Sequence, residues 1–519
     1  MTDAVLWTGG RVFTGRRYVG ALLTEGGRVI AAGAEGPVRA QAPTGVDRRS
    51  LRGHLIVPGL IDAHLHLSEV ARRRSGLDLS TAPSREAALA AVAAWAADHP
   101  RGPVVGRGFD PERWGDRRWP TATDLDSVVG DRPTMVFHAS GHALVANSVA
   151  LREVSAGATG RTEPAPGRSA DARPSGAVYE DAMRPLSAMA SAAEPVGPEA
   201  LHSVLRELSS LGVTGVGGMN ASPEEVEALR ALGGSGRLPV WTRTYLRLAD
   251  LSRVRVDRPA EDDRWGIVGV KAFLDGAFGP RTAWLSAPYS DAPERDGLEV
   301  GEDGELAEAL ARAGELGLAP ALHAIGDRAV GRACRLLDAL PRHGAAPPRI
   351  EHGALTPPAV LAALDRIRPT VVVQPGFVWS DAWLTDRVGP GRARWAYAFR
   401  TLRSRGIPLA ASSDAPYDPV DPWRGLAATV ARCDPAGRSA NPEGSESLAP
   451  EEALALYTGG AADALGLPLR GRLEPGDRAD LLVLSAPDLR SAVRGGRSSV
   501  AETWSDARRV FAGPGALGE

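Results

Sequence analysis

The sequence contains almost no lysine and very little cysteine. Lys271 is the single lysine among 60 basic residues, so arginine supplies nearly all of the positive charge. Cys334 and Cys433 form no CxxC pair and are too few for a disulfide framework, which is typical of a protein from a reducing compartment. The formal net charge is -3 and the basic residues are scattered, so the composition argues against a nucleic-acid-binding protein or a polybasic membrane anchor.

Long apolar runs are also absent. No stretch approaches the length of a membrane span. The opening residues, MTDAVLWTGGRVFTG, lack the basic and apolar regions of a signal peptide. We therefore expect a cytoplasmic protein without nucleic-acid or membrane partners, and the sequence leaves a homodimer open. A chain of 519 residues can form several domains or one large barrel with additions.

Eight apolar, strand-like runs occur along the chain, and helical patterns separate most of them. The runs are residues 60–67, 213–220, 240–248, 269–276, 319–327, 349–354, 370–377 and 407–416. Alternating β and α units in this number predict an α/β fold, a (β/α)8 TIM-like barrel. The interval after the first run is too long for one helix, so residues at about 71–195 are expected to form an inserted α+β cap.

The two ends of the chain share a texture of short strands and glycine turns. Residues 1–57 and 470–519 are therefore predicted to be the two parts of one β-sandwich, since chain termini often lie close together. Two independent flaps are the alternative. In this division, residues 58–469 form the barrel with its cap.

Residues able to bind metal occur at or near the ends of five of the eight runs. They are His64, His66, Lys271, His323, His352 and Asp414. The carboxyl ends of the strands hold the active site in barrels of this type. In the His-x-His pair both side chains point to the same side of a strand. Any one of these histidines could instead be satisfied by a backbone carbonyl, but six such positions in barrel order favour a metal site.

Lys271 has a chemical property that arginine lacks. A buried lysine amine can lose its proton, whereas a guanidinium effectively cannot. The neutral amine can then add carbon dioxide to form a carbamate, an anionic oxygen ligand able to bridge two metal ions. The alternative is that Lys271 is only a remnant of a drift towards arginine codons.

Several segments carry a family resemblance. PGLIDAHLHL, GVKAFLDGAFGPRTAWL, LHAIGDRAV, RIEHGAL and ASSDAPYDPVDPWRGL resemble signature segments of the amidohydrolase superfamily. GRGFDPERW, SGHALVANSVAL and PSGAVYEDAM are similar to segments of its YtcJ-like branch, which includes N-substituted formamide deformylases. The likeness covers nearly the whole chain, and its motifs are more specific for the superfamily than for a substrate.

The resemblance implies a metal-dependent hydrolase with two divalent ions, most often zinc. His64, His66 and Asp414 would hold one ion, His323 and His352 the other, and a carbamate on Lys271 would bridge them. Asp414 would also be the catalytic group, moving a proton from a metal-activated water to the leaving nitrogen. The implied reaction is cleavage of a non-peptide C–N bond in a small amide-like substrate, with N-formyl or N-acyl amines favoured.

Other activities remain open. A cyclic amide or ester hydrolase would use the same barrel. A deaminase would also do so, but it requires a glutamate three residues after the histidine of the fifth run, and Gly326 stands at that position after His323. From a different class, the chain could be a catalytically silent barrel that binds small molecules.

Three residues are candidate substrate contacts: His142, Arg281 and Trp379. Each has a structural alternative. His142 could only complete the hydrogen bonds of a loop, Arg281 could form an ion pair within a loop, and Trp379 could pack against a helix. Trp379 belongs to a group of rings after the last two runs that indicates an apolar or aromatic substrate pocket; the group is Phe377, Trp379, Trp383, Trp395, Tyr417 and Trp423. Glu351 directly precedes His352, so strand alternation predicts that it points away from the site.

Overall fold

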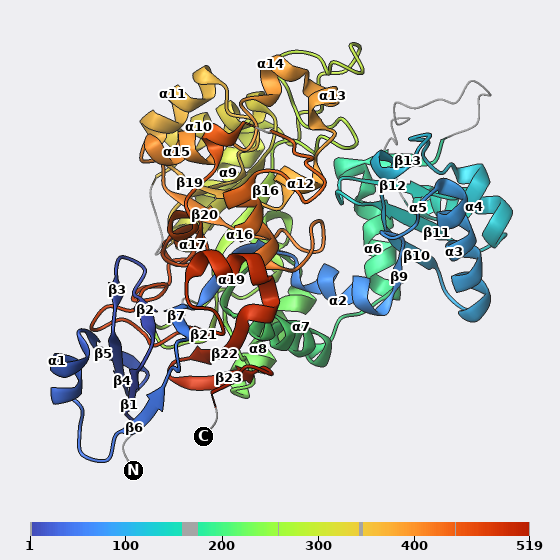
Figure 1. Cartoon of the computed structure of the whole chain (residues 1–519). Coiled ribbons are helices and arrows are strands. Elements are labelled where there is room, and N and C mark those ends of the chain that lie inside the picture. Colours follow the sequence, from blue (N-terminus) through green and yellow to red (C-terminus); the bar gives the residue numbers. More distant parts are fainter. Residues whose placement is uncertain (1–2, 158–174, 258, 342–345, 442, 518–519) are drawn as a thin grey trace. The chain divides into compact units, whose positions relative to one another are not determined.

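The chain folds into two compact units, which are described separately below. The computed structural model describes residues 3–157, 175–257, 259–341, 346–441 and 443–517 (Figure 1). The first unit comprises Met1–Leu67, Gly197–Leu274 and Gly301–Glu519, and the second comprises Ser68–Val196 and Asp275–Val300.

The centre of the first unit is an eight-stranded sheet in the order β20-β19-β18-β17-β16-β15-β14-β8. Every neighbouring pair in this sheet is parallel. Its strands are β8 (Leu60–Leu65), β14 (Val213–Ala221), β15 (Trp241–Arg247), β16 (Trp265–Phe273), β17 (Ala319–Ala324), β18 (Arg349–His352), β19 (Thr370–Val373) and β20 (Leu409–Ala411). All eight overlap the predicted runs, so the barrel prediction is confirmed.

Helices connect most of these strands and cover the barrel (Figure 1). They include α7 (Pro198–Ser210), α8 (Pro223–Gly234), α9 (Asp303–Glu315), α10 (Asp327–Ala339), α11 (Pro358–Ile367), α15 (Phe399–Ser404), α16 (Pro422–Ala431), α17 (Pro450–Leu456) and α18 (Gly459–Ala464). Because helices cover the outside and side chains fill the inside, the strands are buried on both faces and read as nearly continuous apolar runs. The interior is packed, and Tyr245, Ala321, Val372 and Ala410 belong to one buried cluster.

Hydrogen bonds join the first strand of the barrel to the segment after the last. The His66 amide donates to the Ala415 carbonyl at 2.8 Å, and the Asp414 amide donates to the His64 carbonyl at 2.9 Å. The carboxylate of Asp62 accepts the Ser413 amide at 3.1 Å. These bonds close the barrel and place two sequence-distant segments side by side.

The two ends of the chain form a pair of sheets in the first unit. One sheet has the order β5-β4-β1-β6 and the other β23-β22-β21-β7-β2-β3. Their strands are β1 (Val5–Thr8), β2 (Arg11–Phe13), β3 (Tyr18–Val19), β4 (Ala21–Glu25), β5 (Arg28–Gly33), β6 (Asp47–Ser50), β7 (Leu55–Pro58), β21 (Leu481–Leu484), β22 (Val500–Ser505) and β23 (Arg508–Ala512). The antiparallel pairing of β21 with β7 joins the two ends in one sheet, so the predicted sandwich is confirmed.

The second unit is built on its own sheet, in the order β13-β12-β11-β10-β9. The strands are β9 (Leu77–Asp78), β10 (Val104–Phe109), β11 (Thr134–His138), β12 (Ala143–Ala146) and β13 (Ala177–Tyr179). Its longer helices are α2 (Leu67–Ser75), α3 (Arg85–Asp98), α4 (Ala122–Val129), α5 (Ser148–Gly157) and α6 (Arg184–Ala193). The first residue of α2, Leu67, is assigned to the first unit. Two apolar clusters form its interior, one around Val104 and Trp114 and the other around Met135 and Leu144.

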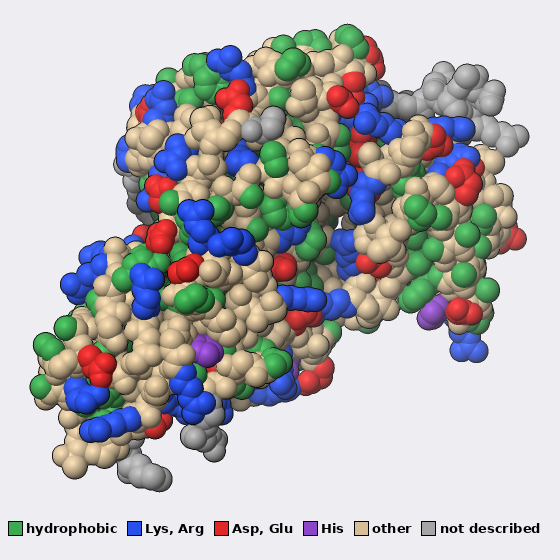
Figure 2. Space-filling model, viewed as in Figure 1, with side chains coloured by type: hydrophobic (Ala, Val, Ile, Leu, Met, Phe, Trp, Pro, Cys, Tyr) green, Lys and Arg blue, Asp and Glu red, His purple; other side chains and the backbone are tan. Residues whose placement is uncertain are grey.

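Charged side chains of both signs are interspersed over the face shown in Figure 2. Large apolar residues that are clearly exposed occur singly, for example Ile30 at 41% and Leu316 at 47% exposure, and isolated exposures of this kind are normal. Across the described ranges, no helix is both long enough and apolar enough to cross a membrane.

Gly217 offers a test of the close packing between β8 and β14. A Cβ atom at this position would lie 2.3 Å from the Ala63 carbonyl oxygen, whereas one at Gly234, in the last turn of α8, would meet nothing within 4 Å. We expect Gly217→Ala to lower the free energy of unfolding by about 1–3 kcal/mol, because backbone must move. Gly234→Ala is the control and should be neutral or stabilising by about 0.5–1 kcal/mol. Urea unfolding of both variants measures the difference, and equal stabilities would contradict the packing argument.

Candidate metal centre

Three ligand-type atoms converge at the carboxyl end of β8. His64 Nε2 lies 3.1 Å from Asp414 Oδ1, and His66 Nε2 lies 3.3 Å from the same oxygen. The two Nε2 atoms are 3.4 Å apart. All three side chains are buried. Among the His, Cys, Asp and Glu side chains of the described residues, these three have ligand atoms close enough together to hold a metal ion.

The backbone around this cluster departs from regular strand geometry. Asp414 follows the end of β20 and has a φ of 57°, and His352, the last residue of β18, has a φ of 73°. A non-glycine residue with positive φ is uncommon and costs energy, so such positions concentrate at functional sites. At both residues the unusual backbone occurs where a candidate ligand projects from a strand end.

The other two predicted histidine ligands lie next to each other. The ring centroids of His323 and His352 are 4.5 Å apart, and those of His352 and His64 are 5.3 Å apart. The Nδ1 atom of His352 is 4.0 Å from Asp414 Oδ2. His323 and His352 therefore extend the cluster formed by His64, His66 and Asp414.

Lys271 is buried in β16, with only 1% of its surface exposed. Its register partner in β17 is Ala321, two residues before His323. Its Nζ atom lies 4.9 Å from the centre of the Phe273 ring. The lysine is therefore in the barrel interior, where burial makes a charged amine costly.

Burial and neighbouring positive charge keep His66 and His352 neutral. Burial, together with the charges of Lys271 and His64, lowers the pKa of His352 to about 3 despite the opposing charge of Asp414. Burial is also the main cause of the lowered pKa of His66. For Asp414, burial would raise the pKa, but contacts with His64, His66 and His352 lower it well below its ordinary value. Neutral imidazoles beside an ionised carboxylate are the states in which these groups bind metal.

The donor set fits a zinc-type ion. Points separated by 3.1–3.4 Å can all lie about 2 Å from one centre, which is the length of zinc–nitrogen and zinc–oxygen bonds. Asp414 Oδ1 is buried and forms no hydrogen bond with another described group. A buried, ionised oxygen without a hydrogen bond is costly, and a bound cation would remove that cost.

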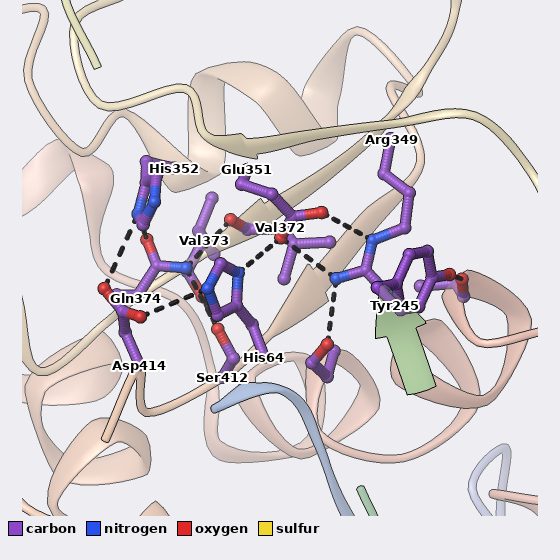
Figure 3. Close-up of polar contacts among 12 residues, drawn as sticks. His64, Tyr245, Arg349, Glu351, His352, Val372, Val373, Gln374, Ser412 and Asp414 are labelled. Atoms are coloured by element: carbon purple, nitrogen blue, oxygen red, sulfur yellow. Dashed lines mark hydrogen bonds and ion pairs between the residues drawn. The ribbon is translucent and has the colours of Figure 1, made fainter. Parts of the chain in front are cut away.

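Glu351 and Gln374 contact two of the histidines (Figure 3). Glu351 Oε2 lies 2.6 Å from His64 Nδ1, and Gln374 Oε1 lies 2.7 Å from His352 Nδ1. The expectation that Glu351 points away from the site is therefore wrong. That expectation assumes that side chains alternate strictly along the strand. The positive φ of His352 interrupts the alternation, so the side chains of Glu351 and His352 both reach the barrel interior. Gln374, one residue past β19, carried no signal that distinguishes it from other polar residues at strand ends.

Glu351 belongs to a fully buried ion pair. Arg349 Nε donates to Glu351 Oε1 at 2.7 Å, and Arg349 Nη2 donates to Oε2 at 2.9 Å. Burial would raise the pKa of Glu351, but the charge of Arg349 and the contact with His64 lower it well below its ordinary range. Glu351 is therefore a carboxylate that accepts hydrogen bonds from Arg349 and from His64.

Three aromatic rings lie against the imidazoles. Tyr417 is 5.1 Å from His66, Phe273 is 5.1 Å from His323 and Phe377 is 6.5 Å from His352, measured between ring centroids. These rings give the neighbourhood of the cluster an apolar wall.

Two tryptophans of the predicted aromatic group have different positions. Trp379 lies in the short helix α12 (Phe377–Ser380), with the Arg424 guanidinium 5.5 Å above its ring. Trp423 is almost completely buried and donates its indole N–H to the Leu211 carbonyl at 2.9 Å, just before β14 begins. Trp423 therefore packs the fold at the opposite end of the strand from the metal-type cluster.

The remaining predicted contacts belong to the second unit. His142 Nδ1 lies 2.9 Å from Glu180 Oε2, and Arg281 is paired with Asp291 at 2.8 Å. His142 and Arg281 therefore each have a local charged partner, and their role as substrate contacts stays a prediction.

Comparison with known proteins agrees with this architecture. The sequence profile described as "Amidohydrolase family" matches residues 49–511. The chain belongs to the amidohydrolase family. Together with the barrel and the His–His–Asp cluster, this membership identifies a metal-dependent hydrolase.

Individual members of the family resemble the chain over most of its length. It is 30% identical to "Putative amidohydrolase YtcJ" of Bacillus subtilis (strain 168), with 92% of this chain and 94% of that protein aligned. It is 29% identical to the N-substituted formamide deformylase of Arthrobacter pascens, over 89% of both chains. An uncharacterized metal-dependent hydrolase from Pyrococcus furiosus has a similar structure, with a TM-score of 0.72, 32% identity and coverage of 94% of this chain and 99% of that one.

The lowered pKa of His352, about 3, predicts how the stability of the metal-free protein depends on pH. Below about pH 6.5 the unfolded chain gains a proton at this histidine while the folded chain does not, so the free energy of unfolding falls as the pH falls. One such group contributes at most about 1.4 kcal/mol per pH unit. Urea unfolding between pH 7 and pH 4 should therefore show a shallower decline for His352→Gln. The exposed His99 provides the control variant, His99→Gln, and identical slopes for wild type and His352→Gln would contradict the prediction.

Proposed function

We propose that this protein hydrolyses a non-peptide C–N bond of an amide-like small molecule, using two divalent metal ions, most simply zinc. N-formyl and N-acyl amines are the favoured substrates. The observation that carries the proposal is the convergence of His64, His66 and Asp414, with the buried Oδ1 of Asp414 forming no hydrogen bond with another described group.

The proposed ligands divide into two groups around Lys271. His64, His66 and Asp414 would hold one ion, and His323 with His352 would hold the second. A carbamate on Lys271 would bridge the two ions. The burial of Lys271 supports this role, because a buried amine loses its proton more easily and the neutral amine is the form that adds carbon dioxide. Arginine at this position would be unable to react in this way.

The chemistry that bound ions would supply is polarisation of the substrate carbonyl and activation of water near neutral pH. Asp414 is the proposed proton carrier. Its lowered pKa keeps it ionised, so the carboxylate would hold a proton only transiently as water attacks the carbonyl carbon. The same carboxyl group then donates that proton to the leaving nitrogen as the C–N bond breaks. The burial of these side chains supports limited access of bulk water to them.

The substrate class rests on two observations. A relative with similarity over most of its length is an N-substituted formamide deformylase. In addition, Tyr417, Phe273 and Phe377 lie against the imidazoles, and such rings favour an apolar or aromatic substituent on the amine. Trp379 remains a proposed contact for that substituent.

Substitution of Lys271 tests the bridging role. We expect Lys271→Arg and Lys271→Ala to retain less divalent metal per chain and to lose amide hydrolysis by more than about a hundredfold, because neither side chain can form the carbamate. A short carboxylic acid added to Lys271→Ala should partly restore both properties by replacing the missing bridge. Metal analysis and amide-hydrolysis assays measure these effects, and normal turnover in Lys271→Arg would refute the role.

A substrate panel tests the reaction class. We expect kcat/KM to be highest for N-formyl aromatic amines, followed by N-acetyl amines, and lower by at least about tenfold for lactams and esters, since pocket contacts typically discriminate by this amount. Aminoheterocycles in the same panel test the deaminase alternative. Preferential release of ammonia from them would replace the amide proposal, and a metal-loaded protein that cleaves none of the compounds would favour a binding barrel.

A further inference from the structure

Two of the proposed metal ligands are each held by a hydrogen bond through Nδ1, but the acceptors differ in charge (Figure 3). The partner of His64 is the carboxylate of Glu351, and the partner of His352 is the side-chain amide of Gln374. All four side chains are buried. The hydrogen bond at Nδ1 decides which ring nitrogen carries the proton and therefore which one is available as a ligand.

For His352, a chain of hydrogen bonds determines the orientation of the partner. Ser412 Oγ donates to the Val373 carbonyl at 3.3 Å and accepts from Gln374 Nε2 at 3.0 Å. Gln374 Nε2 also donates to the Val372 carbonyl at 3.2 Å. The amide nitrogen is therefore on the side of these acceptors, and Oε1 faces His352. An amide oxygen only accepts, so His352 Nδ1 carries the proton and Nε2 keeps its lone pair.

For His64, the charge of the partner has the same effect. Glu351 is ionised because it is bound by two nitrogens of the buried Arg349. It therefore accepts the proton of His64 Nδ1, and the lone pair of Nε2 faces His66 and Asp414. A carboxylate partner makes an imidazole a stronger base, and hence a stronger ligand, than an amide partner does.

We propose that Glu351 and Gln374 are positioning residues that rank the two metal ions. The anionic Glu351 makes the His64 ion the first to bind and the last to leave. The neutral Gln374 fixes the ring of His352 without adding charge, so the second ion is held more weakly. This inference rests on the proposed function, because it concerns the ions that function requires.

A purely structural role for Glu351 is the competing explanation. Arg349 is fully buried, donates to the Ala63 carbonyl at 2.8 Å and lies 4.7 Å above the Tyr245 ring. Removing Glu351 alone would leave this guanidinium uncompensated, which is strongly destabilising. The informative variant therefore removes both charges at once, Arg349→Met with Glu351→Gln, because it eliminates the need for a counter-ion.

The experiment measures the affinity of each ion separately. Metal-free full-length protein is titrated with Co²⁺, whose visible absorption reports each ligand environment, in competition with a chelator. In the double variant we expect the first ion to bind about 10–100-fold more weakly while the second changes little, as is typical when a ligand's supporting partner is altered. In Gln374→Leu we expect the reverse pattern. Tyr245→Phe is the control for disturbance of the barrel core and should bind both ions as wild type does.

The outcomes separate the two hypotheses. If the double variant and Gln374→Leu are folded and bind both ions with wild-type affinity, the ranking is wrong while the proposed function stands. If wild-type protein binds no divalent ion, the proposed function itself fails. Should the double variant not fold, Gln374→Leu decides alone: selective weakening of the second ion supports the inference, and equal weakening of both or of neither overturns it.

Discussion

The hydrogen bonds that close the barrel are the constraint on which the site depends. His64 and Asp414 are 350 positions apart in the sequence, yet their backbones are hydrogen-bonded at 2.9 Å. This bond and the neighbouring one between His66 and Ala415 bring together side chains from the first and last strands. Each side chain alone would be a buried polar group with a desolvation cost. Together they form a cluster in which a cation lowers the cost for all of them.

Much of this arrangement could be predicted from the sequence, because the sequence shows both the apolar runs of buried strands between helical patterns and the two-residue spacing of side chains on one face of a strand. The strands are buried on both faces, so they appear as short apolar runs between helical patterns. The His-x-His spacing places both rings on one side of β8. Barrel geometry then puts the carboxyl ends of parallel strands at one rim, which is why strand order already indicated that Lys271, His323 and His352 lie near one another. Their assignment as metal ligands came from the family resemblance and stays a prediction. The shared sandwich was predicted from the similar turn-rich texture of the two ends, and the pairing of β21 with β7 agrees with it.

What escaped prediction depends on contacts that no local pattern records. Alternation along β18 assigned Glu351 to the wrong side, because the sequence does not reveal the positive φ of His352. Gln374 is recognisable only through its contacts with His352 and Ser412 in space. The segment Asp275–Val300 belongs to the second unit although it follows a barrel strand directly. In each case the missing information is tertiary, since it concerns how distant parts of the chain approach each other.

The arrangement of charge around the cluster follows a consistent physical logic. Arg349 neutralises the charge of Glu351, so that carboxylate can accept from His64 without leaving a net buried charge. Lys271, as a protonated amine, would repel a cation bound to the neighbouring imidazoles. In the same way, its positive charge lowers the pKa values of His66 and His352. Conversion of that amine to an anionic carbamate would reverse the opposition. The only lysine of the chain thus lies beside imidazoles whose pKa its positive charge lowers. Under the proposed function arginine could not replace it, because a guanidinium cannot form the carbamate.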